Sequence, residues 1–443
     1  MPSANVIVVG GGLAGLAAAV ALADSGFQVS ILEKSPRLGG RATSYELSDG
    51  ETIDNCQHVT LGCCTNLADF YRRIRASGKI KFHQTLVFAG PDGRRAEIRK
   101  SSLPAPLHLA PSFARFPFLD WTDKRRIAGA LFRIARSGGR PRISSSMTML
   151  DWLKQQRQTP RGIERFWKTV LVSALNENLD RMDAGYGITV FWKAFLSNSE
   201  GFAIGIPAVP LSELYDFRHD RIDVRTRTGV AEVRSDVVRL EDGSDLRAGY
   251  CVVAIPFERL AKVLPVVSVS NLRLSPITSV HFWFDRVVMR EPFAAVLDRT
   301  IQWIFNRSNG QYVQIVISAS YGLTGRSQPE IIELCRKELA EIIPATKEAG
   351  LKRSVVIREN SATFSPEPGC DVWRPSQRTP IPNVFIAGDW TQTGWPATME
   401  GAVRSGYLAA EEILKAEGVE GRFLQPDLPA KGISAWFAGK MGS

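Results

Sequence analysis

The sequence lacks a long run of apolar residues. None reaches the eighteen or so residues that a helix needs to span a bilayer, and the longest is a run of small side chains at residues 16–22. The N-terminus also has no charged region followed by an apolar core, because Met1-Pro2-Ser3-Ala4 leads directly into a strand-like segment. We therefore expect a chain that neither crosses a membrane nor is secreted.

Cysteine is scarce and has no metal-binding spacing. Six cysteines occur in 443 residues, none in a C-x-x-C pair. The adjacent Cys63 and Cys64 suit neither zinc nor an ordinary disulfide. We expect reduced thiols, a cytoplasmic setting and no metal site.

Acidic residues are outnumbered by basic ones, and the formal net charge is +10. Such a charge favours anionic partners. Nucleic acid is not expected, because zinc-finger spacing, an RNA-binding aromatic signature and a helix-turn-helix pattern are all missing. An anionic membrane surface or diphosphate-bearing neighbours are the favoured partners, and a generally basic surface without such a partner is the alternative.

One segment has the composition of a membrane contact. Residues 103–136 combine leucines and aromatic residues with basic residues, as a helix lying in the membrane interface requires. Phe113, Phe116 and Phe118 are the predicted lipid contacts. The alternative is a proline-rich loop that packs on the rest of the protein.

A glycine-rich motif opens the chain between two apolar segments. Residues 6–9 predict a buried strand, after which Gly10 allows a tight turn. Gly12 lets the backbone approach a pyrophosphate, and Gly15 lets the next helix pack closely. The free N–H groups at the start of that helix would face phosphate. Glu33 ends the second strand, where a carboxylate can accept both ribose hydroxyls of an adenosine, so we predict a dinucleotide-binding βαβ unit.

Further motifs favour FAD over NAD. Gly39-Gly40-Arg41 comes soon after Glu33, and residues 384–389 end in a Gly-Asp pair. Residues 399–406 read Met-Glu-Gly-Ala-Val-Arg-Ser-Gly and predict the start of a helix. Together, these motifs resemble the flavin-containing amine oxidase and phytoene desaturase superfamily. The resemblance implies that FAD is the cofactor.

The resemblance also implies roles for residues at both ends of the chain. Arg41 would neutralise the pyrophosphate, and Asp389 would hold ribityl and phosphate groups. Met399 would open a helix whose N-terminus points at the flavin ring. The other cofactor-binding residues that the resemblance implies are Gly10, Gly12, Ala14, Gly15, Glu33, Lys34, Gly40, Val230 and Gly388.

The superfamily has an α/β fold, in which a Rossmann-like FAD-binding domain is interleaved with an α+β substrate domain. The length fits two domains, because 443 residues exceed the size at which a single core stops growing. We expect the discontinuous FAD-binding domain at residues 1–82, 203–275 and 370–420. The substrate-binding domain is expected at residues 83–202 and 276–369, and residues 421–443 are expected to form a C-terminal tail.

Shorter stretches of the sequence resemble one branch of this superfamily. Residues 54–66 have the Asn-x-Gln-His form of the squalene-associated FAD-dependent desaturases, and residues 174–177, 206–215, 280–285 and 389–400 are similar to that branch. The branch implies reductive removal of a hydroxyl from hydroxysqualene, a C30 isoprenoid, in bacterial squalene and hopanoid synthesis. It also implies neighbouring squalene-pathway enzymes as partners and peripheral attachment to the inner face of the cell membrane.

Such a reaction needs a proton donor and apolar walls. His58 is the first candidate donor, because imidazole titrates near neutral pH, and Asp54 is the second. A structural hydrogen bond to a backbone carbonyl is the alternative for His58, and His281 is expected to be structural. The candidate wall residues are Phe166, Trp167, Phe191, Trp192, Phe195, Phe282, Trp283 and Phe284.

Three classes of function stay open at this stage. The first is reductive dehydroxylation of a C30 isoprenoid. The second is carotenoid desaturation or amine oxidation, in which electrons flow from the substrate to the flavin. The third is a non-catalytic, membrane-associated protein that binds FAD, because one fold can carry many functions.

Overall fold

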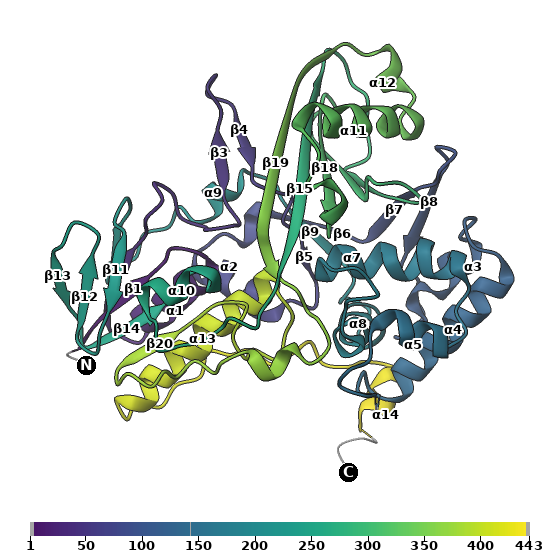
Figure 1. Ribbon diagram of the computed structural model, residues 1–443. Helices are drawn as coiled ribbons and strands as arrows, with labels where there is room; N and C mark the ends of the chain where they lie inside the picture. Colours follow the sequence, from purple (N-terminus) through teal and green to yellow (C-terminus); the bar gives the residue numbers. More distant parts are fainter. Residues whose placement is uncertain (1–3, 142, 440–443) are drawn as a thin grey trace.

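The computed structural model describes residues 4–141 and 143–439, which form two main sheets and a helical region (Figure 1). The first sheet has five parallel strands in the order β10-β2-β1-β14-β20. Its strands are β1 (Asn5–Val9), β2 (Gln28–Leu32), β10 (Ile222–Arg225), β14 (Tyr250–Val253) and β20 (Val384–Ile386). The N-terminal βαβ unit is therefore completed by strands from the middle and the end of the chain.

Helix α1 (Leu13–Asp24) contacts both this sheet and helix α13 (Met399–Ala416). Every residue of α1 except Asp24 is buried, which explains why the segment is apolar all round rather than amphipathic. A Cβ added at Gly406 of α13 would lie 2.2 Å from the carbonyl oxygen of Ala14. Glycine at this position therefore allows the two helices to pack in close contact.

The second sheet is mixed and has seven strands in the order β19-β15-β18-β17-β16-β7-β8, with only β16 and β7 parallel. Its strands are β7 (Thr85–Ala89), β8 (Arg95–Arg99), β15 (Leu274–Phe284), β16 (Phe293–Val296), β17 (Trp303–Ser308), β18 (Tyr312–Ser318) and β19 (Leu351–Phe364). Together, the parallel sheet and the mixed sheet confirm the predicted α/β fold class.

Side chains alternate between the two faces of the mixed sheet. Phe282 and Phe284 lie in a core with residues of helix α11 (Gln328–Ile342). Trp283, between them, lies on the opposite face and stacks on Tyr312. The prediction that Phe282 and Phe284 line a substrate tunnel is therefore wrong, because β15 turns them toward α11.

The remaining elements are short strands and the helical region at the lower right of Figure 1. The short strands are β3 (Ser44–Glu46), β4 (Thr52–Asp54), β5 (Thr60–Leu61), β6 (Ile80–His83), β9 (Ile204–Pro207), β11 (Val230–Val233), β12 (Val237–Leu240) and β13 (Asp245–Arg247). The other helices are α2 (Thr65–Arg73), α3 (Ala110–Arg115), α4 (Trp121–Arg136), α5 (Met149–Gln155), α6 (Pro160–Gly162), α7 (Thr169–Leu175), α8 (Ala184–Val190), α9 (Leu211–Leu214), α10 (Phe257–Val263), α12 (Ala345–Glu348) and α14 (Ile433–Gly439).

The helical region corrects the predicted lipid contacts. Phe116 and Phe118 are buried, and their rings contact each other edge to face. Phe113 is partly buried against Phe166. These three aromatic residues therefore pack inside the protein. In the part of the chain that the structure describes, no helix is long and apolar enough to cross a membrane.

Candidate functional site

The glycines of the first motif occupy positions where a side chain would not fit. Gly10 has φ of +107°, and a Cβ there would lie 2.5 Å from the carbonyl oxygen of Ala254. A Cβ at Gly15 would lie 2.0 Å from the oxygen of Gly10. Gly12 precedes α1, which has neither a side-chain cap nor an acidic residue in its first turn. The N–H groups at this end of α1 are therefore suited to a phosphate.

The second glycine motif lies directly against the first. The N–H of Gly39 donates to the oxygen of Gly11 at 2.8 Å. A Cβ at Gly40 would lie 3.0 Å from the Cα of Gly12. Two bare backbone segments thus meet at the start of α1, and Gly10, Gly12, Ala14, Gly15 and Gly40 come together there.

Glu33 lies at the same end of the sheet. Its carboxylate accepts hydrogen bonds from the N–H of Gly11 at 2.6 Å and of Ser35 at 2.7 Å. The N–H of Thr228 donates to the oxygen of Glu33, which brings the loop before Val230 next to it. Lys34 differs, because its ammonium group is exposed and pairs with Glu241 at 2.7 Å. The Lys34 side chain therefore points to the surface.

An ion pair joins the two ends of the chain. Nη2 of Arg41 donates to Oδ1 of the buried Asp389 at 2.7 Å, and Nη1 donates to the oxygen of Ala362 in β19 at 2.6 Å. Burial alone would lower the pKa of Arg41, but the carboxylates of Asp389, Glu258 and Glu359 together outweigh burial and raise it. The predicted pyrophosphate and ribityl residues are thus in direct contact. Next to them, a Cβ at Gly388 would lie 2.1 Å from the Trp390 indole nitrogen.

Met399 is the first residue of α13, whose start is capped by Thr398. Oγ1 of Thr398 accepts from the N–H of Gly401 at 3.1 Å. Glu400 turns away from this helix, and its carboxylate accepts from the N–H groups of Asn66 at 3.2 Å and Leu67 at 2.7 Å. Glu400 therefore caps α2, and the sequence analysis missed this role.

His58 belongs to a loop that is bonded to Arg41. Nδ2 of Asn55 donates to the backbone oxygen of Arg41 at 3.0 Å, and the half-buried His58 has its Nδ1 3.0 Å from the oxygen of Cys56. Because a carbonyl oxygen can only accept, Nδ1 carries the hydrogen of the neutral ring. Nε2 has no hydrogen-bond partner among the described residues. Burial lowers the pKa of His58 below its ordinary value.

Asp54 is buried and acts only as an acceptor. Its Oδ1 accepts from Oγ of Ser44 at 2.8 Å and from the N–H of Leu211 at 3.0 Å, and its Oδ2 forms an ion pair with Arg307. Arg307 also donates to Gln57 at 2.8 Å. Both carboxylate oxygens of Asp54 are therefore occupied by donors of the protein itself. The geometry therefore favours His58 over Asp54 as the proton donor.

The sequence analysis missed Arg307, because an arginine in a strand-like segment looks like an ordinary surface residue. It lies on the sheet face that also carries the buried His281. The Tyr312 hydroxyl lies 2.7 Å from Nδ1 of His281, and Oγ of Ser279 lies 3.2 Å from Nε2. Burial lowers the pKa of His281 to about 3, so its ring is neutral and structural, as expected. Nearby on this face are Phe293, Trp303 and Phe305.

Contacts thus connect many of the predicted residues into one candidate site, whereas the Lys34 ammonium points to the surface. The bare backbone at the start of α1 fits a pyrophosphate, and Glu33 fits a ribose on one side of it. Arg41, which follows Gly40, pairs with Asp389 and accepts a hydrogen bond from the loop that carries His58. An extended cofactor with two phosphates therefore fits these residues. Among the residues described, no cluster of three or more His, Cys, Asp or Glu could hold a metal.

Comparison with known proteins finds a matching family and relatives of the chain. The family model "Flavin containing amine oxidoreductase" matches residues 13–414. The chain is 27% identical to "15-cis-phytoene desaturase, chloroplastic/chromoplastic" of an Oncidium hybrid cultivar, over 93% of this chain and 78% of that protein. It is 25% identical to "Probable zeta-carotene desaturase" of Synechococcus elongatus, over 94% of this chain and 99% of that protein.

Solved structures share the fold. A crystal structure of an oxidoreductase from Methanosarcina mazei superposes with a TM-score of 0.70 at 16% identity, covering 93% of this chain and all of that one. The family match extends over most of the sequence, from the start of α1 into α13, and includes Arg41 and Asp389. The chain therefore belongs to the flavin-containing amine oxidoreductase family and is an FAD-dependent oxidoreductase.

Proposed function

We propose that the protein is a hydroxysqualene dehydroxylase, which removes the hydroxyl of hydroxysqualene and releases squalene. The observation that carries this proposal is His58, whose Nε2 is unpartnered among the described residues while its Nδ1 is fixed on Cys56. The relatives support an isoprenoid substrate, because those compared are by name desaturases of phytoene and zeta-carotene. The Asn-x-Gln-His block at residues 55–58 supports the squalene-associated branch.

The proposed reaction balances with one proton and one hydride, which together convert the C–OH group into C–H and water. His58 in its imidazolium form gives the Nε2 proton to the allylic hydroxyl, the C–O bond breaks, and water leaves. Reduced FAD, when bound, supplies the hydride equivalent that replaces the hydroxyl. Aromatic side chains stabilise a cation that forms as water leaves. Trp303 and Phe305 lie on the sheet face that meets the Asp54–His58 loop through Arg307.

Carotenoid desaturation is the second candidate, favoured by the names of the relatives. A desaturase passes electrons from the substrate to the flavin and does not need to protonate a hydroxyl. A role for His58 as an acid therefore separates the two functions.

Product analysis separates the two functions. The FAD-loaded protein is reduced under anaerobic conditions and incubated with hydroxysqualene, and the products are identified by mass spectrometry. We expect squalene to form in proportion to the reduced flavin consumed. Desaturated products from phytoene with oxidised enzyme, and no squalene, would favour the second candidate. No turnover of either substrate would contradict both.

The FAD is expected to be bound without a covalent link. The Ala387–Ala402 segment contains neither cysteine nor histidine, the residues that would form such a link near the flavin. Heat or acid precipitation should release free FAD into the supernatant, whereas flavin that stays in the pellet would contradict this expectation.

Glu33→Arg should weaken FAD binding by about 10- to 100-fold, because hydrogen bonds to a charged acceptor contribute about 1.5–3 kcal/mol. The bonds from Gly11 and Ser35 to the carboxylate would also be lost. Titration of the apoprotein with FAD, followed by flavin fluorescence, measures the effect. Lys34→Ala is the matched control, because the Lys34 ammonium pairs with Glu241 at the surface, away from the proposed FAD site. Unchanged FAD binding by Glu33→Arg would show that Glu33 does not belong to the site.

The proposed substrate dissolves in lipid rather than in water. We therefore also propose that the protein attaches peripherally to the inner face of the cell membrane, where neighbouring squalene-pathway enzymes would supply its substrate. The charge of +10 supports attraction to anionic lipid.

A further inference from the structure

We infer that helices α4 and α14, with the loop at residues 103–107, form one docking surface for an anionic lipid bilayer. The proposed function gives a reason for such a surface, since its substrate dissolves in lipid. The evidence for the surface itself is independent of the reaction. It consists of exposed apolar side chains, arginines that pair with no acidic residue among those described, and a C-terminal segment that is fixed in place.

Exposed apolar side chains gather on these three segments. Trp121 and Phe132 of α4 are 68% and 55% exposed, and Ile433 and Trp436 of α14 are 40% and 59% exposed. Leu103 of the loop is also exposed. Such a concentration of large apolar residues in water is costly unless another surface covers it.

The segments are far apart in sequence but contact one another. The ring of Phe437 in α14 meets the Phe132 ring edge to face, with centroids 6.0 Å apart. The N–H of Ser434 donates to the oxygen of Ala105 at 3.3 Å. Helix α14 therefore lies between α4 and the 103–107 loop, and Figure 1 shows it below α4 and α5.

The outer face of α4 carries both aromatic and basic side chains, the combination that binds an anionic lipid surface. Trp121, Arg125, Phe132 and Arg136 are all exposed and are spaced to share one side of the helix. The opposite side, which includes Ile127, is buried. Aromatic residues beside basic residues are typical of helices that lie in the membrane interface.

Positive charge around this face is not compensated. Within the described residues, no acidic partner pairs with any of six exposed arginines. They are Arg115, Arg125, Arg126, Arg133, Arg136 and Arg140. Elsewhere, arginines such as Arg234 and Arg239 pair with neighbouring carboxylates. The excess charge complements anionic lipid headgroups and argues against a second basic copy of the chain as the occupant.

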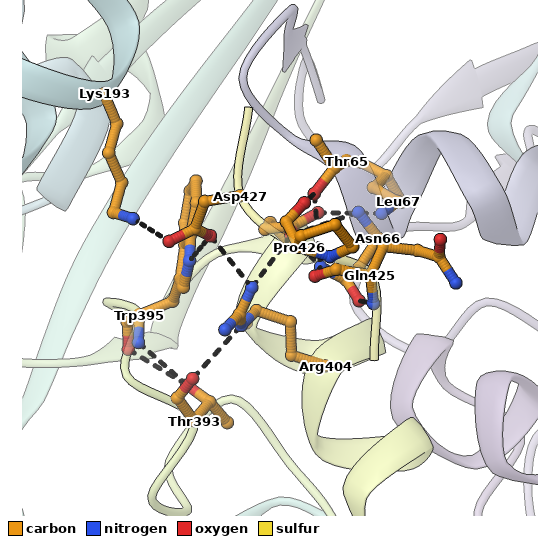
Figure 2. Close-up of polar contacts among 12 residues, drawn as sticks. Thr65, Asn66, Leu67, Lys193, Thr393, Trp395, Arg404, Gln425, Pro426 and Asp427 are labelled. Carbon is orange, nitrogen blue, oxygen red and sulfur yellow. Dashed lines mark hydrogen bonds and ion pairs between the residues drawn. The ribbon is translucent and has the colours of Figure 1, made fainter. Parts of the chain in front are cut away.

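The segment before α14 is held firmly, as Figure 2 shows. Asp427 accepts from the Trp395 indole N–H and from Arg404, both at 3.2 Å, and it also pairs with Lys193. Asn66 exchanges two hydrogen bonds with the backbone of Gln425. The segment thus connects α13, which packs on α1, to the helical region. Helix α14 therefore has a defined position on the surface.

Vesicle binding by the FAD-loaded full chain tests the inference. We expect the protein to sediment with vesicles that contain phosphatidylglycerol, and binding should fall as salt is added. Arg125→Glu with Arg136→Glu should weaken binding at least about tenfold, and Phe132→Ser with Ile433→Ser should also weaken it. Arg234→Glu with Arg247→Glu, on the β11–β13 sheet, is the charge-matched control and should bind like the wild type.

Several outcomes would overturn the inference. One is equal binding to pure phosphatidylcholine vesicles, and another is equal loss of binding in the control pair. A third is a dimer in lipid-free solution that Phe132→Ser with Ile433→Ser dissociates, because the face would then be a contact between two copies. Turnover measured in detergent micelles is a separate readout, so a failure of the dehydroxylase proposal would leave the vesicle result intact.

Discussion

His58→Ala should lower turnover of hydroxysqualene by about 10²- to 10⁴-fold, the range that a positioned acid typically contributes. The variant should still hold FAD, because no cofactor-binding residue uses the His58 ring for a hydrogen bond; Nδ1 bonds only to the oxygen of Cys56. Single-turnover reoxidation of the reduced flavin by hydroxysqualene measures the rate, and flavin absorbance measures FAD content.

The pH profile separates an acid from a merely structural histidine. Because burial lowers the pKa of His58, the imidazolium is the minor form at neutral pH. Turnover should therefore rise as the pH falls from 8 toward the pKa of His58, and this dependence should disappear in His58→Ala. The control is His219→Ala, which removes a histidine that lies near Asp24. Wild-type turnover in His58→Ala would remove His58 from the mechanism.

The nucleotide-binding half of the site could be predicted because its requirements are local. Gly10 and Gly15 lie where a Cβ would collide with backbone, so the chain must have glycine there, and a short sequence window shows this. Arg41 and Asp389 could be connected only through the family resemblance, since no local rule relates residues at opposite ends of the chain. Their ion pair is a product of the tertiary fold.

The substrate side could be predicted less well because it depends on the orientation of strands and helices. Alternation along β15 separates Trp283 from Phe282, and composition alone does not reveal which face meets α11. In the same way, Phe116 looks like a membrane contact beside basic residues, yet it packs inside the protein. Helix α14 has only seven residues and stays in place through contacts with distant segments, which the sequence pattern does not show.

The ion pair between Asp54 and Arg307 is expected to have a large effect on stability. Removal of one partner of a buried pair costs about 3–5 kcal/mol, because the other charge stays buried and unpaired. Arg307→Met should therefore lower the free energy of unfolding by about this amount, and Asp54→Ala should do so as well, since it also removes the acceptor for Ser44 and Leu211. Urea denaturation followed by tryptophan fluorescence measures both effects.

The double variant decides whether the two residues act as a pair. Asp54→Ala with Arg307→Met leaves no unpaired charge, so its loss of stability should be clearly smaller than the sum of the two single losses. Additive losses would show that the two side chains do not interact. Asp54→Asn distinguishes a structural role of Asp54 from a role as proton donor. The amide oxygen of asparagine can still accept from the N–H of Leu211, but the amide cannot supply the proton. If Asp54→Asn abolished turnover while His58→Ala retained it, Asp54 would be the proton donor in place of His58.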